Sequence, residues 1–501
     1  MEQNIYLALR FHTNFYHSYR GDTPDEKGFG KDIRIITSIL DDLDRLNGEG
    51  IPVQGTWDIE NFFSLEKIMP AFSPELIGRL QERVKTGRDA VAPMSWNNGI
   101  VSVSTEEEFD QITRWTISNP MGSGLADLFD SWEPVLRPQE CMYTPSFLKR
   151  YPEQGIQAIS LYYSAHPFNG FSNFMPELSL KERYNPLRVV SRDQGGEMIM
   201  VPAYNNGDVA DHWLSLRRWI KSMRREQLAT PDTGDLLLLI DMDADDEFWS
   251  GMEIPLLTRL APSFDGLYRM IRSLDGLDYL KFITAGEYLK THKPAGTIEL
   301  NQDTADGSRD GLSSWAEKWS NTHLWTLLNE SRRLDRFTDA LGGAAAEPPE
   351  KTEAREMRLK SLTTTHFGLS SPVMNRHRLQ IAGELAARTA ELSAQALKQV
   401  SSAAAADTEA EILLPPGTAG GTGLVRLRTE THGERKLAEN PEDLQTLKGI
   451  QLVRTGEEEA GFLYNCPGGE APQADETGIR NGLVSLESDK AGNSLIRCGE
   501  A

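Results

Sequence analysis

The sequence predicts an α/β protein built on a parallel sheet, either closed as a barrel or open and doubly wound. Short apolar runs alternate with amphipathic stretches over roughly the first three hundred residues. Repeated strand–helix alternation of this kind is typical of parallel sheets. The run LLLLI at 236–240 is apolar on both faces. A parallel strand that is covered by helices on both sides has this composition.

The elements are expected in the following order. The first strand is expected at 4–12, and the segment 31–47 then predicts a helix because its apolar residues recur at steps of three and four. Further strands are expected at 51–58, 89–95, 133–140, 155–164, 197–204, 235–243 and 279–285. Thr105 and Glu108 have the spacing of a capping box, which predicts that another helix begins there.

The pattern changes after residue 310. We expect one domain over 1–310 and a helical domain over 311–400, with a low-complexity insertion at 341–355. A linker is expected at 401–423. From there the region 424–501 has short alternating runs separated by Gly and Asn turns, which predicts a β-rich C-terminal domain.

Composition and charge exclude several classes of function. The chain has 52 Lys and Arg against 74 Asp and Glu, a net charge of −22, whereas nucleic acids and anionic membranes attract clustered basic residues. Cys141, Cys466 and Cys498 are too scattered for a disulfide framework or a Cys-rich zinc site. The N-terminal apolar run ends at Arg10 and predicts neither a signal peptide nor a membrane span. We therefore expect a cytoplasmic enzyme.

Polar and aromatic side chains follow the ends of the predicted strands, where parallel α/β proteins place reactive groups. Sugar rings stack on Trp and Tyr, and their hydroxyls need paired donors and acceptors, which carboxylates, Asn and His supply. The candidates for such a carbohydrate site are His12, Asn14, His17, Trp57, Asp58, Trp96, Asn97, Glu140, Tyr163, His166, Asp241 and Asp243. This set of residues predicts that the site binds a carbohydrate.

Cleavage of a glycosidic bond needs two carboxyl groups, one ionised as nucleophile or base and one protonated as acid. Glu140 and Asp241 end two different predicted strands and are candidates for this pair. The sequence has no phosphate-binding glycine motif, no G-x-S-x-G elbow and no H-E-x-x-H zinc motif. These patterns favour glycosidic chemistry over the other classes.

Three segments resemble the superfamily of glycoside hydrolase families 38 and 57. The segment 137–156 (RPQECMYTPSFLKRYPEQGI) is similar to the family 57 segment that delivers a nucleophilic Glu. The segment 236–251 (LLLLIDMDADDEFWSG) resembles the family 57 strand that ends in an Asp general acid and precedes a Trp-containing turn. The segment 10–17 (RFHTNFYH) stands where both families place a His-rich strand end.

The resemblance implies a seven-stranded (β/α)7 barrel as the catalytic domain. It implies that Glu140 is the nucleophile and Asp241 the general acid/base. Asp243 is then a supporting carboxylate or an alternative acid, and Trp249 joins the substrate-binding candidates. The later helices and the C-terminal segment resemble the helical region and the first part of the β-sandwich in family 38. The short tail would be a partial sandwich, as in a truncated member of the superfamily.

The sequence departs from family 38 at its zinc site. That family binds zinc through a His-x-Asp pair on the first strand, whereas this chain has His12, Thr13 and Asn14. Glu140 also stands in place of the family 38 nucleophilic Asp. We therefore expect no cofactor, and a zinc ion with His12 as a ligand remains the alternative that family 38 implies.

The sequence thus favours a glycoside hydrolase or transglycosylase that acts on α-glycosidic bonds by a retaining mechanism with two carboxylates. One alternative is a zinc-dependent α-mannosidase of the family 38 type. Another is a non-catalytic carbohydrate-binding protein on the same barrel. The expected partner is a carbohydrate and neither a nucleic acid nor a membrane, and the oligomeric state is left open.

Overall fold

The computed structural model describes the chain in segments that form two compact units. The described residues are 3–15, 30–163, 177–251, 262–304, 321–342, 347–367 and 376–404, together with short strands between 425 and 498. Unit 1 comprises Met1–Asn321 and Leu359–Ile381, and unit 2 comprises Thr322–Arg358 and Ala382–Ala501. The predicted domain boundaries remain predictions. Each unit is described by itself below.

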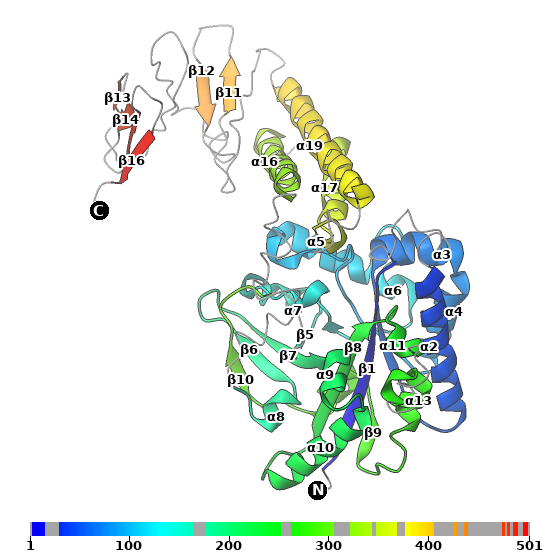
Figure 1. Cartoon of the computed structure of the whole chain (residues 1–501). Helices are drawn as coiled ribbons and strands as arrows, with labels where there is room; N and C mark the ends of the chain where they lie inside the picture. Colours follow the sequence, from blue (N-terminus) through cyan, green and yellow to red (C-terminus); the bar gives the residue numbers. More distant parts are fainter. Residues whose placement is uncertain are drawn as a thin grey trace. The chain divides into compact units, whose positions relative to one another are not determined.

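Unit 1 is built on one large sheet around strand β1 (Figure 1). Its strands are β1 (Ile5–Thr13), β2 (Gly55–Ile59), β3 (Ala90–Val91), β4 (Val135–Leu136), β5 (Ala158–Tyr162), β6 (Leu187–Val190), β7 (Glu197–Tyr204), β8 (Leu236–Asp243), β9 (Leu280–Phe282) and β10 (Thr297–Glu299). β1 pairs in parallel with β8 along most of its length. On its other edge β1 pairs with β9 near its start and with β2 near its end.

The parallel strands follow a path that returns to its starting point. β1, β2 and β3 pair in parallel, and so do β4, β5, β7, β8 and again β1. Two backbone hydrogen bonds connect the β3 and β4 segments, from Glu133 N to Val91 O at 2.8 Å and from Arg137 N to Pro93 O at 3.0 Å. The predicted α/β class is confirmed, and this path is compatible with the predicted barrel.

Three described strands of the sheet lie outside this path, β6, β9 and β10, and of these β6 and β10 were not expected from the sequence. β6 runs antiparallel to β7, and β10 pairs with β6. β6 has the sequence LRVV, with alternating buried and less buried residues. A run of four such residues is too short to distinguish a strand from a loop by its periodicity.

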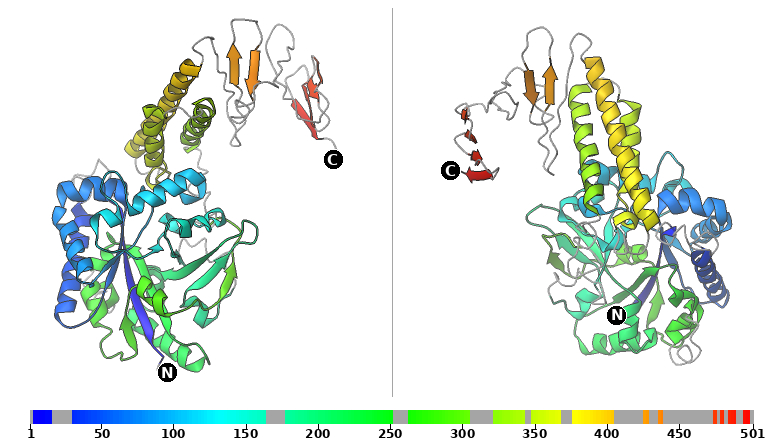
Figure 2. Two further views of the ribbon diagram at one scale, coloured as in Figure 1. Left: turned by 180° about the vertical axis from the view of Figure 1, so that it is seen from behind. Right: turned by 45° about the horizontal axis from the view of Figure 1, so that its top comes forward.

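Helices cover the outside of the strands (Figures 1 and 2). The longer ones in unit 1 are α2 (Gly30–Gly48), α4 (Pro74–Lys85), α5 (Glu106–Ile117) and α10 (Leu216–Ala229). Shorter ones are α3 (Met69–Phe72), α6 (Leu125–Leu128), α7 (Arg150–Glu153), α8 (Leu180–Arg183), α9 (Asn206–Asp211), α11 (Glu247–Ser250), α13 (Leu267–Arg272), α14 (Ala285–Thr291) and α18 (Thr364–Phe367). α5 begins with the predicted capping box of Thr105 and Glu108.

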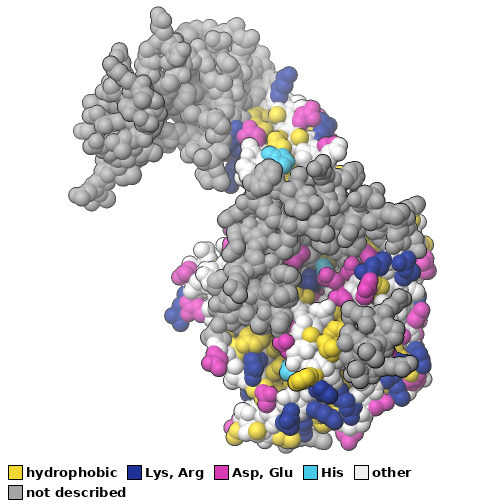
Figure 3. All heavy atoms as spheres, viewed as in Figure 1, with side chains coloured by type: hydrophobic (Ala, Val, Ile, Leu, Met, Phe, Trp, Pro, Cys, Tyr) yellow, Lys and Arg dark blue, Asp and Glu magenta, His cyan; other side chains and the backbone are white. Residues whose placement is uncertain are grey.

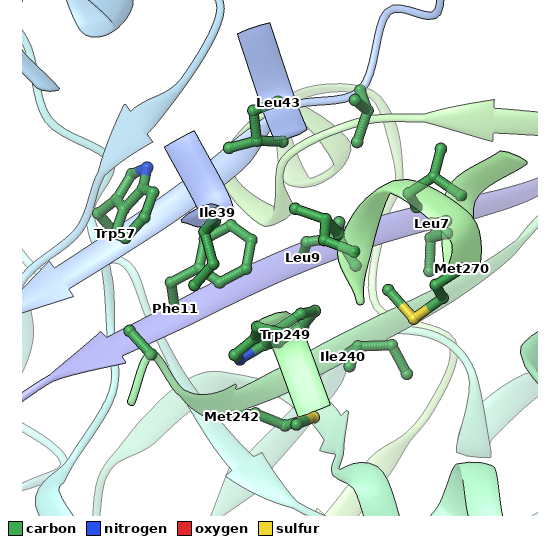
Figure 4. Packing of buried hydrophobic residues seen from close by; sticks show 14 of the residues in the cluster. Leu7, Leu9, Phe11, Ile39, Leu43, Trp57, Ile240, Met242, Trp249 and Met270 are labelled. Atoms are coloured by element: carbon green, nitrogen blue, oxygen red, sulfur yellow. The ribbon is translucent and has the colours of Figure 1, made fainter. Parts of the chain in front are cut away.

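The largest hydrophobic core lies between the strands and these outer helices (Figure 4). Alternate residues of β1, among them Leu7, Leu9 and Phe11, pack against Ile39 and Leu43 of α2. Successive strand residues point to opposite faces of a sheet. The intervening β1 residues therefore point to the inner face of the ring of strands.

Unit 2 contains long helices and, further along the chain, antiparallel strands. α16 (Thr322–Gly342) lies in unit 2, and α17 (Pro349–Ser361) and α19 (Arg376–Ala404) each extend across a boundary between the units. α17 covers part of the segment 341–355, where a low-complexity insertion was predicted. The strands are β11 (Val425–Arg428), β12 (Arg435–Ala438), β13 (Gln473–Asp475), β14 (Gly478–Arg480), β15 (Val484–Ser488) and β16 (Ser494–Cys498).

The strands β11 and β12 pair antiparallel, and β13 to β16 form a second antiparallel sheet. The predicted sandwich remains a prediction. Within the described residues, no helix is both long and apolar enough to span a bilayer.

Candidate functional site

The inner face of the ring carries a cluster of charged side chains. In the register of the sheet, His12 of β1 lies between Asp58 of β2 and Asp243 of β8. Two residues earlier on β1, Arg10 is opposite Asp241 of β8. All of these residues lie near the carboxyl ends of parallel strands, where α/β barrels carry their active sites.

His12 and Asp58 form a buried pair. The Nδ1 atom of His12 lies 2.6 Å from Oδ2 of Asp58, and Arg10 Nε lies 3.8 Å from the other carboxylate oxygen. Burial alone would raise the pKa of Asp58, but the charge and hydrogen bond of His12, followed by the charges of Arg137 and Arg10, lower it. An ionised Asp58 can only accept, so His12 donates from Nδ1 and its Nε2 is left as the atom that can face a ligand.

A second buried ion pair links β8 to the segment after β4. Arg137 Nε donates to Oδ1 of Asp241 at 3.0 Å, and both side chains are almost fully buried. The Arg137 guanidinium also donates to the Tyr162 hydroxyl at 3.3 Å, which in turn donates to the backbone oxygen of Asp241 at 3.0 Å. The other Asp241 oxygen, Oδ2, is buried and has no hydrogen-bond partner.

The charge balance of this cluster distinguishes Asp243 from the other two carboxyl groups. Arg10 and Arg137 face two buried carboxyls, Asp58 and Asp241. Burial raises the pKa of Asp241, and the charges of Arg137 and Arg10 oppose that rise. With these two acids ionised, the charges of the two arginines and the two carboxylates cancel, which leaves His12 and Asp243 as the other ionisable groups of the cluster. Asp243 then adds one further acid to the cluster.

Asp243 is the member of the cluster whose side chain reaches solvent. Protein atoms nevertheless surround it densely, because it lies on the inner face beside His12 and close to Asp245 and Asp246. This desolvation raises its pKa to about 6, although the charge of His12 opposes the rise. Asp243 therefore keeps its proton up to about pH 6, higher than an ordinary aspartate does, and this suits a general acid.

Glu140 lies in a short 3-10 turn, Gln139–Cys141, that follows β4. Glu140 has φ 51° and ψ 29°, and Cys141 has φ 47°, so two consecutive residues other than glycine adopt the left-handed conformation. Strained backbone of this kind clusters at functional sites, where the surrounding structure holds it in place. Glu140 is half-buried, and its Oε1 accepts a hydrogen bond of 2.9 Å from the Gln139 amide.

The predicted substrate-binding tryptophans lie in the protein interior. Trp57 donates to Asp89 at 2.9 Å, Trp96 donates to Glu66 at 2.8 Å, and Trp249 donates to the backbone oxygen of Asp243 at 2.9 Å. All three indoles have an exposed fraction of 0%. A fully buried ring offers no face for a sugar, so we assign these residues to packing.

Trp57 shows most clearly why a tryptophan at a strand end need not face the site. It neighbours Asp58 on β2, and adjacent strand residues point to opposite faces, so the two side chains cannot serve one site. Asp58 points to the inner face, whereas Trp57 packs on Phe11 in the outer core with ring centroids 4.6 Å apart. Figure 4 shows Trp57 beside Phe11 and Trp249 beside Met242.

The remaining candidates are placed as follows. Asn97 is buried and donates to the backbone oxygen of Leu359, which indicates a structural role. Asn14 directly follows β1 and is half-buried, and Tyr163 directly follows β5 and is half-buried. The predictions for His17 and His166 lie outside the described residues.

Sequence reasoning missed Arg10, Arg137, Gln139 and Tyr162. Each lies in a segment that was recognised as a strand or a strand end, so the signal was a charged or polar residue within an apolar run. Arg10 could have been recognised in this way, because an arginine inside a buried strand needs a carboxylate partner. Its partner could not be identified, because the pairing depends on the order of strands in the sheet.

No group of three or more His, Cys, Asp or Glu side chains within the described residues is placed to hold a metal ion. His12, the ligand that family 38 would require, contacts Asp58 through Nδ1, and Nε2 is the ring nitrogen that a metal would use. The zinc alternative therefore stays a prediction.

Solved structures share this fold. A 4-α-glucanotransferase from Thermococcus litoralis has a TM-score of 0.55 and 12% identity, and the match covers 99% of this chain and 84% of that chain. A GH57-type branching enzyme from Pyrococcus horikoshii has a TM-score of 0.50 and 12% identity, with 80% and 91% covered. No protein-family model matches the chain, and no curated protein matches it significantly. These structures confirm the fold that the resemblance implied.

Proposed function

We propose that the chain is a glycoside hydrolase or transglycosylase that cleaves α-glycosidic bonds with two carboxyl groups and retention of configuration. One observation carries the proposal. Two carboxyl groups lie at the carboxyl ends of strands of the same ring: Asp243 ends β8, and Glu140 follows β4. The structures that share the fold include a 4-α-glucanotransferase and a branching enzyme, which supports action on α-glucans.

Glu140 is the proposed nucleophile. It follows β4 at the carboxyl edge of the sheet, is half-buried and is held in a strained turn. It would attack the anomeric carbon and form a glycosyl-enzyme while the leaving oxygen receives a proton. Water or a second sugar hydroxyl would then release the glycosyl group, with the acid acting as base.

Asp243 is the proposed acid/base, in place of the Asp241 that family resemblance favours. A general acid must come within hydrogen-bond distance of the glycosidic oxygen. Asp241 is 1% exposed and one of its oxygens is held by Arg137. Asp243 lies two residues further along β8, on the same face of the sheet, and its side chain reaches solvent.

His12 is proposed to bind a sugar hydroxyl. Asp58 accepts the Nδ1 proton, so the imidazole presents Nε2 to the sugar. We also propose that the reaction needs no resident metal ion, so a chelator should leave turnover unchanged. Loss of turnover on chelation would instead favour the zinc-dependent alternative.

The proposal is tested with aryl α-glycosides whose leaving groups differ in acidity. Glu140→Gln should abolish turnover with every leaving group while the circular dichroism spectrum is unchanged. Asp243→Asn should lower kcat/KM for substrates with poor leaving groups by about 10²–10⁴-fold and leave kcat/KM for dinitrophenyl glycosides nearly unchanged, because the departure of a good leaving group needs no proton. Asp241→Asn should not show this dependence on the leaving group.

Full activity of Glu140→Gln would overturn the assignment of the nucleophile. If leaving-group dependence arises with Asp241→Asn and not with Asp243→Asn, the acid is Asp241. If the wild-type protein binds α-glucans and turns over none of these glycosides, the chain is a carbohydrate-binding protein on the same fold.

A further inference from the structure

Arg137 and Gln139 connect the buried Asp241 to Glu140 through an unbroken series of side-chain contacts. Arg137 Nε donates to Asp241 at 3.0 Å, and Nη1 of the same guanidinium donates to Gln139 Oε1 at 3.4 Å. The Gln139 amide nitrogen donates to Glu140 Oε1 at 2.9 Å. We infer that Arg137 and Gln139 are positioning residues that hold Glu140 ionised and in its left-handed turn. This inference rests on the proposed role of Glu140 as nucleophile.

Several contacts hold the Arg137 side chain in one orientation. Its guanidinium is buried and contacts Asp241 and Tyr162, and its backbone N–H donates to Pro93 O at 3.0 Å. A guanidinium has five donors in a rigid plane, so these partners fix its orientation. Asp241, which the proposed reaction does not use, thereby gains a role as the anchor of Arg137.

Arg137 also determines which way the Gln139 amide points. A guanidinium can only donate, so the amide oxygen of Gln139 must face Arg137. The NH2 group of the same amide then faces Glu140. Without Arg137, the amide could rotate and place its oxygen against the Glu140 carboxylate, which would repel it.

The hydrogen bond from the Gln139 amide affects Glu140 in two ways. A donor to a carboxylate stabilises its charged form and lowers its pKa, and a nucleophile must be ionised to attack. The contact also joins the side chains of two neighbouring residues across a turn in which Glu140 and Cys141 both have positive φ. Neither Arg137 nor Gln139 touches the sugar in this scheme.

Gln139→Glu is the most discriminating substitution, because it keeps the size of the side chain and its ability to accept from Arg137. It replaces the donor to Glu140 with a carboxylate oxygen. We expect the acidic limb of the pH profile of kcat/KM to move up by about one pH unit or more, because the Glu140 nucleophile loses a donor and gains a like charge. We expect kcat to fall about tenfold or more with KM nearly unchanged.

Gln139→Met provides a second variant that removes the donor without adding a charge. It should move the acidic limb in the same direction and by less. Gln157→Met is the matched control, because Gln157 is exposed and lies directly before β5. An acidic limb that stays at its wild-type position in both Gln139 variants would overturn the inference, even if thermal stability falls.

A readout that does not need turnover separates this inference from the proposed function. Carbodiimide reacts with protonated carboxyl groups, so the pH dependence of labelling at Glu140, followed by peptide mass spectrometry, reports its pKa. The labelling midpoint should be higher in Gln139→Met than in the wild type and the control. A raised labelling midpoint without turnover of any glycoside would support the role of Gln139 and contradict the proposed enzymatic function. Turnover with an unchanged midpoint would contradict only the role of Gln139.

Discussion

The raised pKa of Asp243 affects both its proposed role as an acid and the pH dependence of folding stability. Its pKa is raised to about 6 because protein atoms crowd it, so the folded state binds its proton more tightly than the unfolded chain does. Stability from this proton is therefore present below pH 4 and is lost as the pH rises from about 4 to about 6. Above that range the folded protein carries an unfavourable charge at the site.

We predict that Asp243→Asn raises the melting temperature relative to wild type at pH 7.5 and that the difference vanishes near pH 4. The exposed Asp130 supplies the control, and Asp130→Asn should have no pH-dependent effect. The same substitution should remove the alkaline limb near pH 6 from the kcat/KM profile, since the acid must be protonated to act. Thermal scans across pH 4 to 8 check the first part, and equal melting temperatures at both pH values would contradict it.

At the scale of single residues, the sequence identified His12, Asp58, Asp241 and Asp243, because carboxylates and His at the ends of apolar runs are unusual and visible. It could not separate Asp58 from Trp57 beside it. The family resemblance ranked Asp241 above Asp243 as the acid, an order that our proposal reverses. Those distinctions depend on which face is buried and on the position of Arg137, which comes from another strand end.

Among the elements, the π-helix Asn61–Ile68 has an unusual cap at the end of β2. The carboxylate of the fully buried Glu60 accepts from the backbone N–H groups of Phe63 and Ser64, each at 2.7 Å, and from the Ser64 hydroxyl. Burial nevertheless raises the pKa of Glu60 to about 7, and these hydrogen bonds only reduce the rise. The cap is therefore formed by an acid that changes charge near neutral pH.

We predict that this cap makes folding stability pH-dependent. The folded pKa lies above the ordinary value of 4.5, so the stabilisation is present below about pH 4.5 and is lost as the pH rises to about 7. The loss is of the order of 3 kcal/mol. Glu60→Gln should flatten this part of the stability curve, whereas Glu82→Gln, at an exposed position, should not. Urea unfolding at pH 4.5, 6 and 8 measures it, and an unchanged slope in Glu60→Gln would refute the prediction.

The elements themselves were largely predictable. The helix expected at 31–47 is α2, Gly30–Gly48, and the run at 235–243 is β8, because long periodic or uniformly apolar segments leave little choice. Short strands were placed with wider bounds than they have, such as β3 at Ala90–Val91. Strand length depends on the neighbouring strand that supplies hydrogen bonds, and that neighbour is a tertiary feature.

On the scale of the whole molecule, unit 1 is discontinuous in sequence. Its second segment, Leu359–Ile381, contributes hydrogen bonds from Thr364 N to Asn98 O at 2.9 Å and from Ile100 N to Leu362 O at 3.0 Å. The Asn98 amide also donates to the Thr364 hydroxyl at 2.9 Å. This segment therefore completes the loop that follows β3.

We predict that a chain truncated after residue 321 is less stable than one truncated after residue 404. The shorter chain lacks the partners of Asn98 and Ile100 and leaves their buried polar groups unsatisfied, at about 1–3 kcal/mol each. Urea midpoints of the two truncated proteins test this. Equal midpoints would show that the loop after β3 is stable without the second segment.

The net charge of −22 is a property of the whole chain, and its distribution is mixed. On the face shown in Figure 3, Lys and Arg side chains and Asp and Glu side chains both occur over the described surface. The functionally important acids are on the inner face of the sheet, where Arg10 and Arg137 balance two of them. Net charge alone gives no sign of this balance.

The sequence by itself determined the α/β class, the main helices and the carboxyl groups at the strand ends, because these follow from local periodicity and from which residues interrupt apolar runs. Only the tertiary structure decided which of those residues share a face, which carboxyl is held by Arg137 and which reaches solvent. The reason is physical. Adjacent strand residues point to opposite faces, and a buried charge acquires its pKa from partners that lie far away in the sequence.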